Sequence, residues 1–301
     1  IKENTARTLE YAYADWCISR LAKDLGRPQE EVNRFEKRAM NYRNVFDPSV
    51  NFMRGRNEDG TFQSPFRPDK WGDAFTEGSS WHWTWCVLHD PQGLANLMGG
   101  REKMAKRLDE VFTAAPTFDY SYYKRQIHEI TEMLISNMGQ YAHGNQPIQH
   151  AIYLYDYLGH PWKAQYRVRQ VMDKLYTPNP DGLCGDEDNG QTSAWYVFSA
   201  MGFYPVAPGT GEYALGSPLF KKIVLTLENG KKFEISAPQN DSENVYVDKV
   251  MLNGKVYDKN FIRHSDIIKG GKLQFEMSAV PNKLRGTLPE CFPYSFSNEK
   301  K

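Results

Sequence analysis

Three separate stretches of the sequence carry side chains that suit acid–base or metal chemistry. The densest is Gly185–Val206, which begins Gly-Asp-Glu-Asp-Asn-Gly and passes directly into an apolar helical pattern. Gly185 and Gly190 allow the backbone to turn sharply around Asp186 and Asp188. The amides of the helix that follows would stabilise this negative charge. A solvated turn with an ordinary helix N-cap explains the same spacing.

The second stretch is a long loop, Asn51–Ser80, rich in Gly, Pro, Arg and aromatic residues. A loop of this kind between helices typically lines a site. It contains Glu77, with Phe75, Trp81 and Trp83 close in sequence. Neighbouring rings would remove water from the carboxyl and raise its pKa toward the range of a general acid. The alternative is that Glu77 caps the helix that follows.

The third stretch, His143–His150, reads His-Gly-Asn-Gln-Pro-Ile-Gln-His. The amide oxygens of Asn145 and Gln146, together with backbone carbonyls, are hard neutral ligands that suit calcium. Gln146 and His150 are four residues apart and would share a face of a helix that begins at Gln146. An N-cap at Asn145 with Pro147 just inside the helix explains the same order of residues.

The composition excludes several classes of partner. The 301 residues are 40% apolar and 14% aromatic, and 37 basic and 37 acidic side chains give a net charge of zero. This balance favours neither nucleic acid nor an anionic membrane, and no stretch has the apolar length of a membrane-spanning helix. The 4 cysteines form neither a zinc nor a disulfide pattern. The many Trp and Tyr residues suit sugar stacking as well as core packing.

Other familiar signatures fail. The stretch from His128 to Glu132 lacks the second histidine of a zinc protease helix. Residues 186–190 begin like an EF-hand, but Val197 stands where the bidentate Glu belongs. An α/α toroid of the terpene-cyclase kind would need its Asp-rich metal motif on a helix, whereas a turn bounded by glycines is predicted here.

Helices are the main elements expected up to residue 206. Apolar spacing with start and stop signals predicts them at Thr5–Leu25, Gln29–Phe46, Ser79–Leu88, Pro91–Met98, Arg101–Phe112, Tyr123–Ile135, Ile148–Leu158, Pro161–Tyr176 and Thr192–Met201. The apolar face of the first helix is predicted to comprise Leu9, Trp16, Ile18, Leu21 and Leu25. Turns with glycine at residues 25–28, 98–101 and 158–161 each separate two helices, which predicts an array of α/α hairpins.

After Pro205 the pattern changes to short alternating stretches rich in Val, Ile, Phe and Tyr. These predict strands at Lys222–Leu227, Lys232–Ser236, Tyr246–Leu252, Lys255–Tyr257 and Lys272–Met277. Asn-Gly pairs between them are typical of hairpin turns. We therefore expect a mainly α chain in two parts. Residues 1–206 would be a helical (α/α) toroid segment with the three stretches, and residues 207–301 a small antiparallel β module with an irregular tail.

The three stretches together resemble glycoside hydrolase family ninety-two, whose members are calcium-dependent, inverting exo-α-mannosidases. The motifs that carry the resemblance occur in the family's order: Thr76–Trp85 with His89–Leu94, then Gly144–Pro147, then Gly185–Gln191. In that family an N-terminal β-sandwich precedes an (α/α)6 barrel that carries the catalytic groups. The resemblance covers nearly the whole chain. It implies the C-terminal part of such an enzyme, a partial (α/α)6 barrel with the β module, without the sandwich and the first barrel helices.

The resemblance also implies a role for each candidate residue. Glu77 would be the general acid, and Asp186 and Asp188 would be the pair that activates the attacking water. Calcium would be bound by Asn145, Gln146 and Asp188. Substrate contacts would come from Trp81, His82, His143 and His150.

The expected function follows from these roles. The resemblance implies a secreted or periplasmic enzyme that releases terminal mannose from mannose-containing glycans, with the α-1,2 type as the expected preference. Gln146 stands where the family usually has Glu, which removes a charge from the calcium site. Glu77 is retained, which favours glycosidic substrates over mannosyl phosphodiesters. The alternatives are a non-catalytic carbohydrate-binding or structural fragment of the same fold, and a mannosyl-phosphodiesterase.

Overall fold

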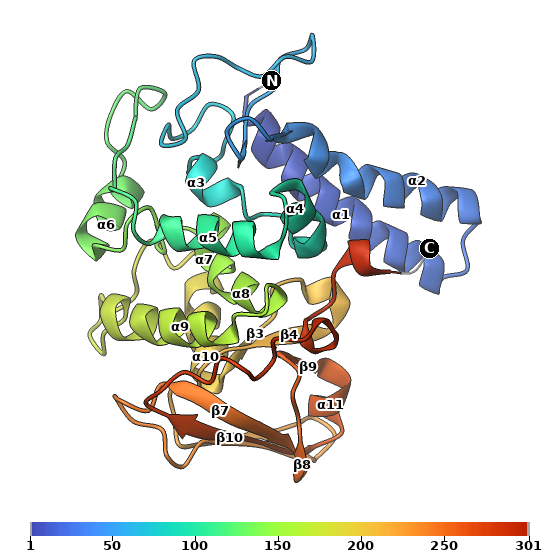
Figure 1. Cartoon of the computed structure of the whole chain (residues 1–301), viewed down its shortest axis with the longest axis vertical. Helices are drawn as coiled ribbons and strands as arrows, with labels where there is room; N and C mark the ends of the chain where they lie inside the picture. Colours follow the sequence, from blue (N-terminus) through green and yellow to red (C-terminus); the bar gives the residue numbers. More distant parts are fainter. Residues whose placement is uncertain (1, 300–301) are drawn as a thin grey trace. The chain divides into compact units, whose positions relative to one another are not determined.

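The computed structural model describes residues 2–299, coloured along the chain in Figure 1. These residues divide into two compact units. The first runs to Ile148 and takes in the chain again from Ser295, and the second is Gln149–Tyr294. Each unit has a hydrophobic cluster of its own.

The first unit begins with a helical hairpin of α1 (Asn4–Asp24) and α2 (Gln29–Ala39), which lie side by side in Figure 1. Gly26, with φ 63°, turns the chain after α1, as the Leu-Gly-Arg-Pro sequence predicts. The second helix is shorter than expected, because the chain tightens into the 3₁₀ helix η1 (Met40–Val45). The hairpin predicted at this position is therefore confirmed, with an earlier end to α2.

The predicted apolar face of α1 is wrong in part. Leu9 and Trp16 are buried, whereas Ile18, Leu21 and Leu25 are 41%, 58% and 68% exposed. Positions 9 and 16 share one face of the helix, and positions 18, 21 and 25 follow a second face with the same period. The buried stripe is completed by small and polar side chains, Thr5, Ala6, Ala12, Asp15, Ser19 and Ala22.

The remaining elements of the first unit are short. A two-stranded ladder pairs β1 (Phe46–Asp47) with β2 (Phe52–Met53), and the helices are α3 (Ser80–Trp83), α4 (Pro91–Leu97), α5 (Arg101–Val111) and α6 (His128–Ser136). The hairpin of α4 and α5 turns at Gly99 and Gly100, both with positive φ, as predicted. The helices expected to start at Ser79 and Tyr123 are shorter, and Tyr123 lies in a turn before α6.

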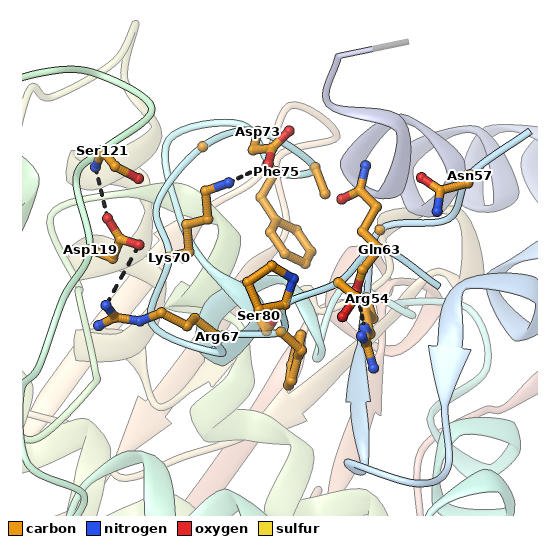
Figure 2. A pocket seen from close by; sticks show the side chains of 16 residues that line it. Arg54, Asn57, Gln63, Arg67, Lys70, Asp73, Phe75, Ser80, Asp119 and Ser121 are labelled. Atoms are coloured by element: carbon orange, nitrogen blue, oxygen red, sulfur yellow. Dashed lines mark hydrogen bonds and ion pairs between the residues drawn. The ribbon is translucent and has the colours of Figure 1, made fainter. Parts of the chain in front are cut away.

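The long loop between β2 and α3 folds back on itself. The Gln63 N–H donates to the Gly55 carbonyl at 2.8 Å. The loop surrounds a cavity of about 430 Å³, shown in Figure 2, whose wall includes Arg67, Lys70 and Asp119. This loop therefore has the internal order expected of one that lines a site.

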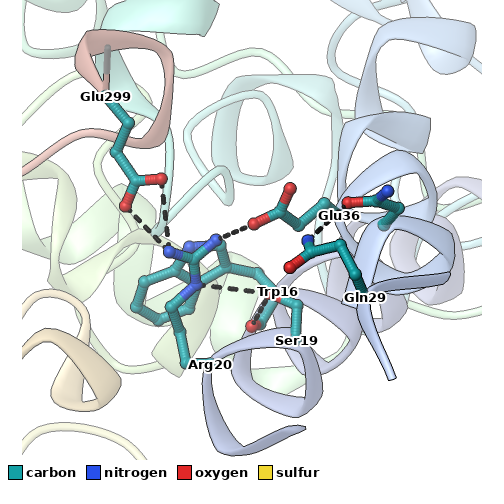
Figure 3. A network of polar contacts seen from close by, with 7 residues as sticks. Trp16, Ser19, Arg20, Gln29, Glu36 and Glu299 are labelled. Carbon is teal, nitrogen blue, oxygen red and sulfur yellow. Dashed lines mark hydrogen bonds and ion pairs between the residues drawn. The ribbon is translucent and has the colours of Figure 1, made fainter. Parts of the chain in front are cut away.

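Residues 295–299 belong to the first unit and contact Asp90, the N-cap of α4. Its carboxylate accepts hydrogen bonds from the Tyr42 hydroxyl, from the Ser295 hydroxyl and from both the N–H and the hydroxyl of Ser297, at 2.6–2.8 Å. Nearby, Arg20 on α1 pairs with Glu36 at 2.5 Å and with Glu299 at 2.9 Å (Figure 3). Asp90 and Arg20 thus anchor residues 295–299 to the helical hairpin and α4.

Replacing Asp90 by Ala is expected to lower the free energy of unfolding by about 3 kcal/mol, because several buried donors lose their acceptor. Burial alone would raise the pKa of Asp90, but the bonds from Ser297, Tyr42 and Ser295 hold it below its usual value. Its contribution is therefore present above the unfolded pKa of about 3.9. It is lost as the pH falls through the folded pKa. Urea unfolding at several pH values measures both effects, with the exposed Asp24→Ala change as control.

The helices from Gln146 onward follow the expected order. The stretch predicted as one helix at 148–158 is divided into α7 (Gln146–Gln149), the 3₁₀ helix η2 (Ala151–Tyr153) and α8 (Leu154–Tyr157). The predicted hairpin at residues 158–161 is confirmed, with Gly159 at φ 79° between α8 and α9 (Pro161–Leu175). The helix α10 (Gln191–Met201) ends at Gly202 with φ 94°.

Two sheets follow these helices. The larger has the strand order β5 (Lys222–Thr226), β6 (Lys232–Ser236), β10 (Gly271–Ser278), β7 (Tyr246–Leu252) and β8 (Lys255–Val256). The smaller consists of β3 (Phe203–Tyr204), β4 (Glu212–Leu215) and β9 (Phe261–Arg263).

The expected all-antiparallel module is wrong at one strand pair. β10 pairs with β7 in antiparallel fashion, with Phe275 opposite Val250, but with β6 in parallel, with Leu273 opposite Ile235. The chain makes β7, β8, β9 and the short helix α11 (His264–Ile268) before β10 returns to the space between β6 and β7. A strand inserted between two others that run in opposite directions must be parallel to one of them.

The predicted division at residues 206 and 207 falls inside the second unit, because α8, α9 and α10 belong to the same compact unit as the strands. Helical hairpins occur at the three predicted turns, and their closure into an (α/α)6 barrel stays a prediction.

Within residues 2–299, none of the helices has both the length and the apolar character needed to cross a membrane.

Candidate active site

Glu77 lies in the turn of residues 76–79 (the Glu77 turn), where its own backbone is left-handed with φ 43°. A residue with a Cβ disfavours this conformation, so neighbouring groups must hold it. The Glu77 N–H donates to the Tyr123 hydroxyl at 3.1 Å, and the Glu77 carbonyl accepts the Asn145 Nδ2–H at 2.6 Å. The carboxyl side chain is exposed. The turn therefore presents the carboxyl at the surface while its main chain is bonded on both sides.

The expected enclosure of Glu77 by aromatic rings is not seen in this chain. Trp83 is buried and donates its Nε1–H to the carbonyl of Thr76 at 2.7 Å. Trp81 is 9% exposed and packs edge-on against Phe52, with ring centroids 4.8 Å apart. Both rings support the backbone near the turn and leave the carboxyl uncovered.

Ser79 caps α3, so the expectation that Glu77 does so is wrong. The Trp81 N–H donates to Ser79 Oγ at 3.3 Å, and the Ser79 N–H donates to His82 Nδ1 at 2.9 Å. His82 Nε2 then donates its hydrogen to the Gln140 carbonyl at 3.0 Å. Burial lowers the pKa of His82 to about 4, so its ring is neutral near pH 7. Both ring nitrogens have protein partners, and substrate contact by His82 stays a prediction.

Asn145 joins the second and third sequence stretches. In addition to its bond to Glu77, its Oδ1 accepts the Gln146 N–H at 3.1 Å at the start of α7. Pro147 is the second residue of that helix, as the capping alternative also predicts. An amide oxygen has a second lone pair, and neutral amide oxygens are suitable calcium ligands, so Asn145 and Gln146 fit this ion by donor chemistry. Among residues 2–299, no three His, Cys, Asp or Glu side chains gather as a metal-binding group.

The two candidate histidines that flank this motif are buried, His143 at 1% and His150 at 6% exposed. The Tyr141 hydroxyl lies 2.7 Å from His143 Nδ1, and burial lowers the pKa of His143 to about 3. The helix α7 begins at Gln146, as the expected face shared with His150 requires, and His150 follows it with right-handed backbone at φ −74°. Substrate contact by either histidine stays a prediction.

The acidic turn in the second unit has the sharp backbone that its glycines predict. The residues with positive φ are Gly185 at 72°, Asp188 at 53°, Asn189 at 57° and Gly190 at 96°. Asn and Asp tolerate this conformation better than other residues with side chains, and Gly adopts it freely. The turn leads directly into α10, as the sequence indicates.

Glu187 closes this turn. Its carboxylate accepts the Gly190 N–H at 2.7 Å and the Ser193 hydroxyl at 2.5 Å. Both bonds lower the pKa of Glu187, and the bond from Ser193 has the larger effect. Asp186 and Asp188 are exposed on either side of it in sequence. The middle carboxylate of the three thus has a structural role.

The candidate residues belong to both units. Those of the first unit are Glu77, Trp81, His82, His143, Asn145 and Gln146, and those of the second are His150, Asp186 and Asp188. The structure brings Glu77 and Asn145 into direct contact. An arrangement of Glu77 with Asp186 and Asp188 around one sugar stays a prediction.

A narrow recess, too tight to hold a water molecule, lies at the candidate residues of the first unit. It is lined by Trp71, Glu77, His82, Ala142, Asn145, Pro147 and Ile148. Residues 72–75 and Ser80 line the larger cavity of Figure 2 instead. Residues on either side of Glu77 thus contribute to the larger cavity, whereas Glu77 itself lines the narrow recess.

Tyr123 and Gln140 are partners of the candidate residues that the sequence did not single out. Tyr123 is one of three tyrosines at positions 120, 122 and 123, and it is the residue at which a helix was expected to begin. This local enrichment in tyrosine was the available signal, and it does not specify which hydroxyl meets a backbone amide. Gln140 acts on His82 through its main-chain carbonyl, which no side-chain pattern marks.

Comparison with known proteins gives one consistent family. The description "Glycosyl hydrolase family 92 catalytic domain" matches residues 1–279. A family GH92 inverting mannosidase from Bacteroides thetaiotaomicron is similar, at 56% identity and a TM-score of 0.89 over 99% of this chain and 40% of that chain. A family GH92 alpha-mannosidase of the same organism, solved with mannoimidazole, is 40% identical with a TM-score of 0.89 over 98% of this chain and 39% of that chain.

An uncharacterized secreted glycosidase from Arthroderma benhamiae is 28% identical over 90% of this chain and 35% of its own length. The chain thus spans about 40% of the solved relatives and 35% of the curated one. The family match itself extends over most of the chain and includes all three sequence stretches. This chain belongs to glycosyl hydrolase family 92.

Proposed function

We propose that this chain is the part of an inverting, calcium-dependent exo-α-mannosidase that contains the catalytic groups, and that it releases terminal mannose with a preference for α-1,2 linkages. Family membership and the similarity to solved mannosidases support this proposal. The observation that carries it is the 2.6 Å hydrogen bond from Asn145 to the main chain of Glu77. This bond joins the proposed general acid to the motif proposed to bind calcium.

Glu77 is the proposed general acid, which donates a proton to the oxygen of the departing group. One carboxylate of the pair Asp186 and Asp188 is proposed to take a proton from the attacking water. The negative charge of the other is proposed to assist this transfer. Inverting glycosidases hold the two carboxyl functions about 6.5–9.5 Å apart, so that water fits between sugar and base. The exposed side chains of all three residues are compatible with access to a substrate.

Calcium is proposed to be held by Asn145, Gln146 and Asp188. When bound, it would engage vicinal hydroxyls of mannose and favour distortion of the ring toward the transition state. Gln146 supplies a neutral oxygen, so the ion is expected to bind less tightly than in a site with a carboxylate there. Trp81, His82, His143 and His150 remain proposed substrate contacts. A buried neutral histidine can also act by fixing the residues around it, as His82 does in the cap of α3.

The proposed compartment is extracellular or periplasmic. The Arthroderma relative, which is described as secreted, supports this proposal. The proposed partners are mannose-containing glycans and the remaining segments of a full-length family 92 enzyme, since the chain spans about 40% of its solved relatives.

Chelation is the test of this proposal. The full-length polypeptide that carries this sequence is incubated with α-1,2-mannobiose, and the anomer released first is identified by proton NMR. We expect β-mannose first, loss of activity with a calcium chelator, and recovery when calcium is returned. Release of α-mannose first would contradict inversion. Cleavage of mannose-1-phosphate diesters but not of mannobiose would favour the phosphodiesterase, and binding without turnover the non-catalytic alternative.

A further inference from the structure

We propose that Tyr123 is a positioning residue for Glu77. Its hydroxyl accepts the Glu77 N–H at 3.1 Å and thereby holds the carboxyl at the angle needed for proton donation. This inference rests on the proposed role of Glu77 as general acid. Tyr123 lies 46 residues from Glu77 in sequence and belongs to none of the three motifs.

The Glu77 turn needs such support because of its backbone. At φ 43°, Glu77 has a conformation in which its Cβ is crowded by its own carbonyl, and the right-handed alternative is favoured for an unrestrained residue. A return to that alternative would rotate the Cα–Cβ bond and move the carboxyl away from its present direction. Gly78, which follows, has no Cβ to restrict this change.

Three side chains oppose the rotation, each through one main-chain group. Trp83 Nε1 donates to the Thr76 carbonyl, the Glu77 N–H donates to Tyr123, and Asn145 Nδ2 donates to the Glu77 carbonyl. The Gly72 N–H also donates to the Gly78 carbonyl at 2.9 Å. Tyr123 supplies the sole partner among these for the N–H of Glu77 itself, so its loss leaves the peptide plane that precedes the acid held on one side alone, by the bond from Trp83 to the Thr76 carbonyl.

The Tyr123 hydroxyl is suited to this role. Burial raises the pKa of Tyr123 to about 12, so the group stays neutral over the working range of a glycosidase. Its ring packs edge-on against Tyr122, with centroids 5.2 Å apart, and against the buried cluster of Trp71, Ile130, Met133 and Ala142. The ring is therefore held by packing, and removal of the oxygen alone leaves that packing in place.

The segment that carries Tyr123 (residues 119–123, the support loop) is itself attached to the chain just before the Glu77 turn. The Trp71 N–H donates to the Asp119 carbonyl and the Asp119 N–H to the Asp69 carbonyl, both at 2.9 Å. Arg67 pairs with Asp69 at 3.0 Å. Figure 2 shows its ion pair with Asp119, at 3.7 Å, and the hydrogen bond from the Ser121 N–H to the Asp119 carboxylate.

The support loop also approaches residue 72 closely. A Cβ added at Gly72, which has φ 81°, would lie 2.3 Å from the Tyr122 ring. Only glycine permits this approach without displacement of the ring. The support loop and the Glu77 turn are thus held together from both sides, and the position of Tyr123 is set relative to Glu77.

A Tyr123→Phe change tests the inference in the full-length polypeptide. We expect kcat/KM for a substrate with a poor leaving group, α-1,2-mannobiose, to fall roughly 5–10-fold, the size of one neutral hydrogen bond. With an activated aryl α-mannoside, which needs little protonation, the expected fall is less than about twofold. The matched control is Tyr122→Phe, which removes the neighbouring hydroxyl; within residues 2–299 no hydrogen bond from that hydroxyl is seen.

The dependence on the leaving group separates positioning from structural damage. A partly unfolded enzyme loses activity equally on both substrates, and equal losses, or none, would overturn the inference. Glu77→Gln is measured in parallel. If that variant loses activity selectively on mannobiose and Tyr123→Phe does not, the positioning role alone is wrong. If Glu77→Gln has full activity on mannobiose, the proposed acid is wrong, whatever the result for Tyr123.

Discussion

A Glu77→Gln variant is expected to cleave α-1,2-mannobiose roughly 10²–10⁴-fold more slowly than the unchanged enzyme. Gln has nearly the shape of Glu but has no acidic proton to give to the leaving oxygen. The bonds of Tyr123 and Asn145 to residue 77 involve its main chain, so they persist in the variant. An activated aryl α-mannoside is expected to lose far less activity. The measurement is kcat/KM with both substrates.

The matched control for this prediction is Glu58→Gln. Glu58 is an exposed carboxyl of the same long loop, so its replacement removes an equal charge from that loop. We expect this control to have the activity of the unchanged enzyme with both substrates. A loss in Glu77→Gln that is the same for mannobiose and for the aryl mannoside would show that Glu77 does not act as a proton donor.

The backbone conformation of several turns was predictable from the sequence. Gly26, Gly159, Gly185 and Gly190 all have positive φ at the turns where the sequence places them. The reason is that a left-handed position depends mainly on the residue that occupies it. The helix after Gly190 was likewise expected within one residue of its observed start, because a change from glycine and acid to apolar periodicity marks it.

Contacts between distant residues were not predictable in the same way. His82 meets the carbonyl of Gln140, 58 residues away, and Glu77 meets Tyr123, 46 residues away. The sequence does not indicate which partner a backbone carbonyl or a tyrosine hydroxyl will contact. The exposed side chain of Glu77 has a related cause, since Trp81 and Trp83 are close in sequence but direct their contacts to Phe52 and Thr76.

The sheet shows the same limit at the level of strands. Alternation predicted β6 and β10 close to their observed ends, since the pattern within each strand records which face is buried. It does not record which strand lies beside it. The parallel pairing of β10 with β6 depends on the path of the chain through β7, β8 and β9, and hence on contacts that alternation cannot express.

An Asp188→Asn variant is expected to show the second large loss, roughly 10²–10⁴-fold in kcat/KM, because an amide cannot take a proton from water. The change is well matched to its position. Asn tolerates the left-handed backbone of residue 188, and the bond from the Gln191 N–H to the carbonyl of Asp188 at 3.2 Å involves the main chain. The same measurement on Asp186→Asn identifies the carboxylate whose charge matters more.

Chemical rescue assigns the role of this carboxylate. Azide ion attacks without giving up a proton, so it should restore turnover of an activated aryl α-mannoside by the Asp188→Asn variant and yield β-mannosyl azide. The exposed Asp181→Asn change in the same unit is the control, with full activity and no response to azide. If azide rescues Asp186→Asn instead, the base is Asp186. If it rescues neither variant, or if both variants have full activity, the acidic turn before α10 does not supply the base, and the proposed mechanism fails at the step in which water is activated.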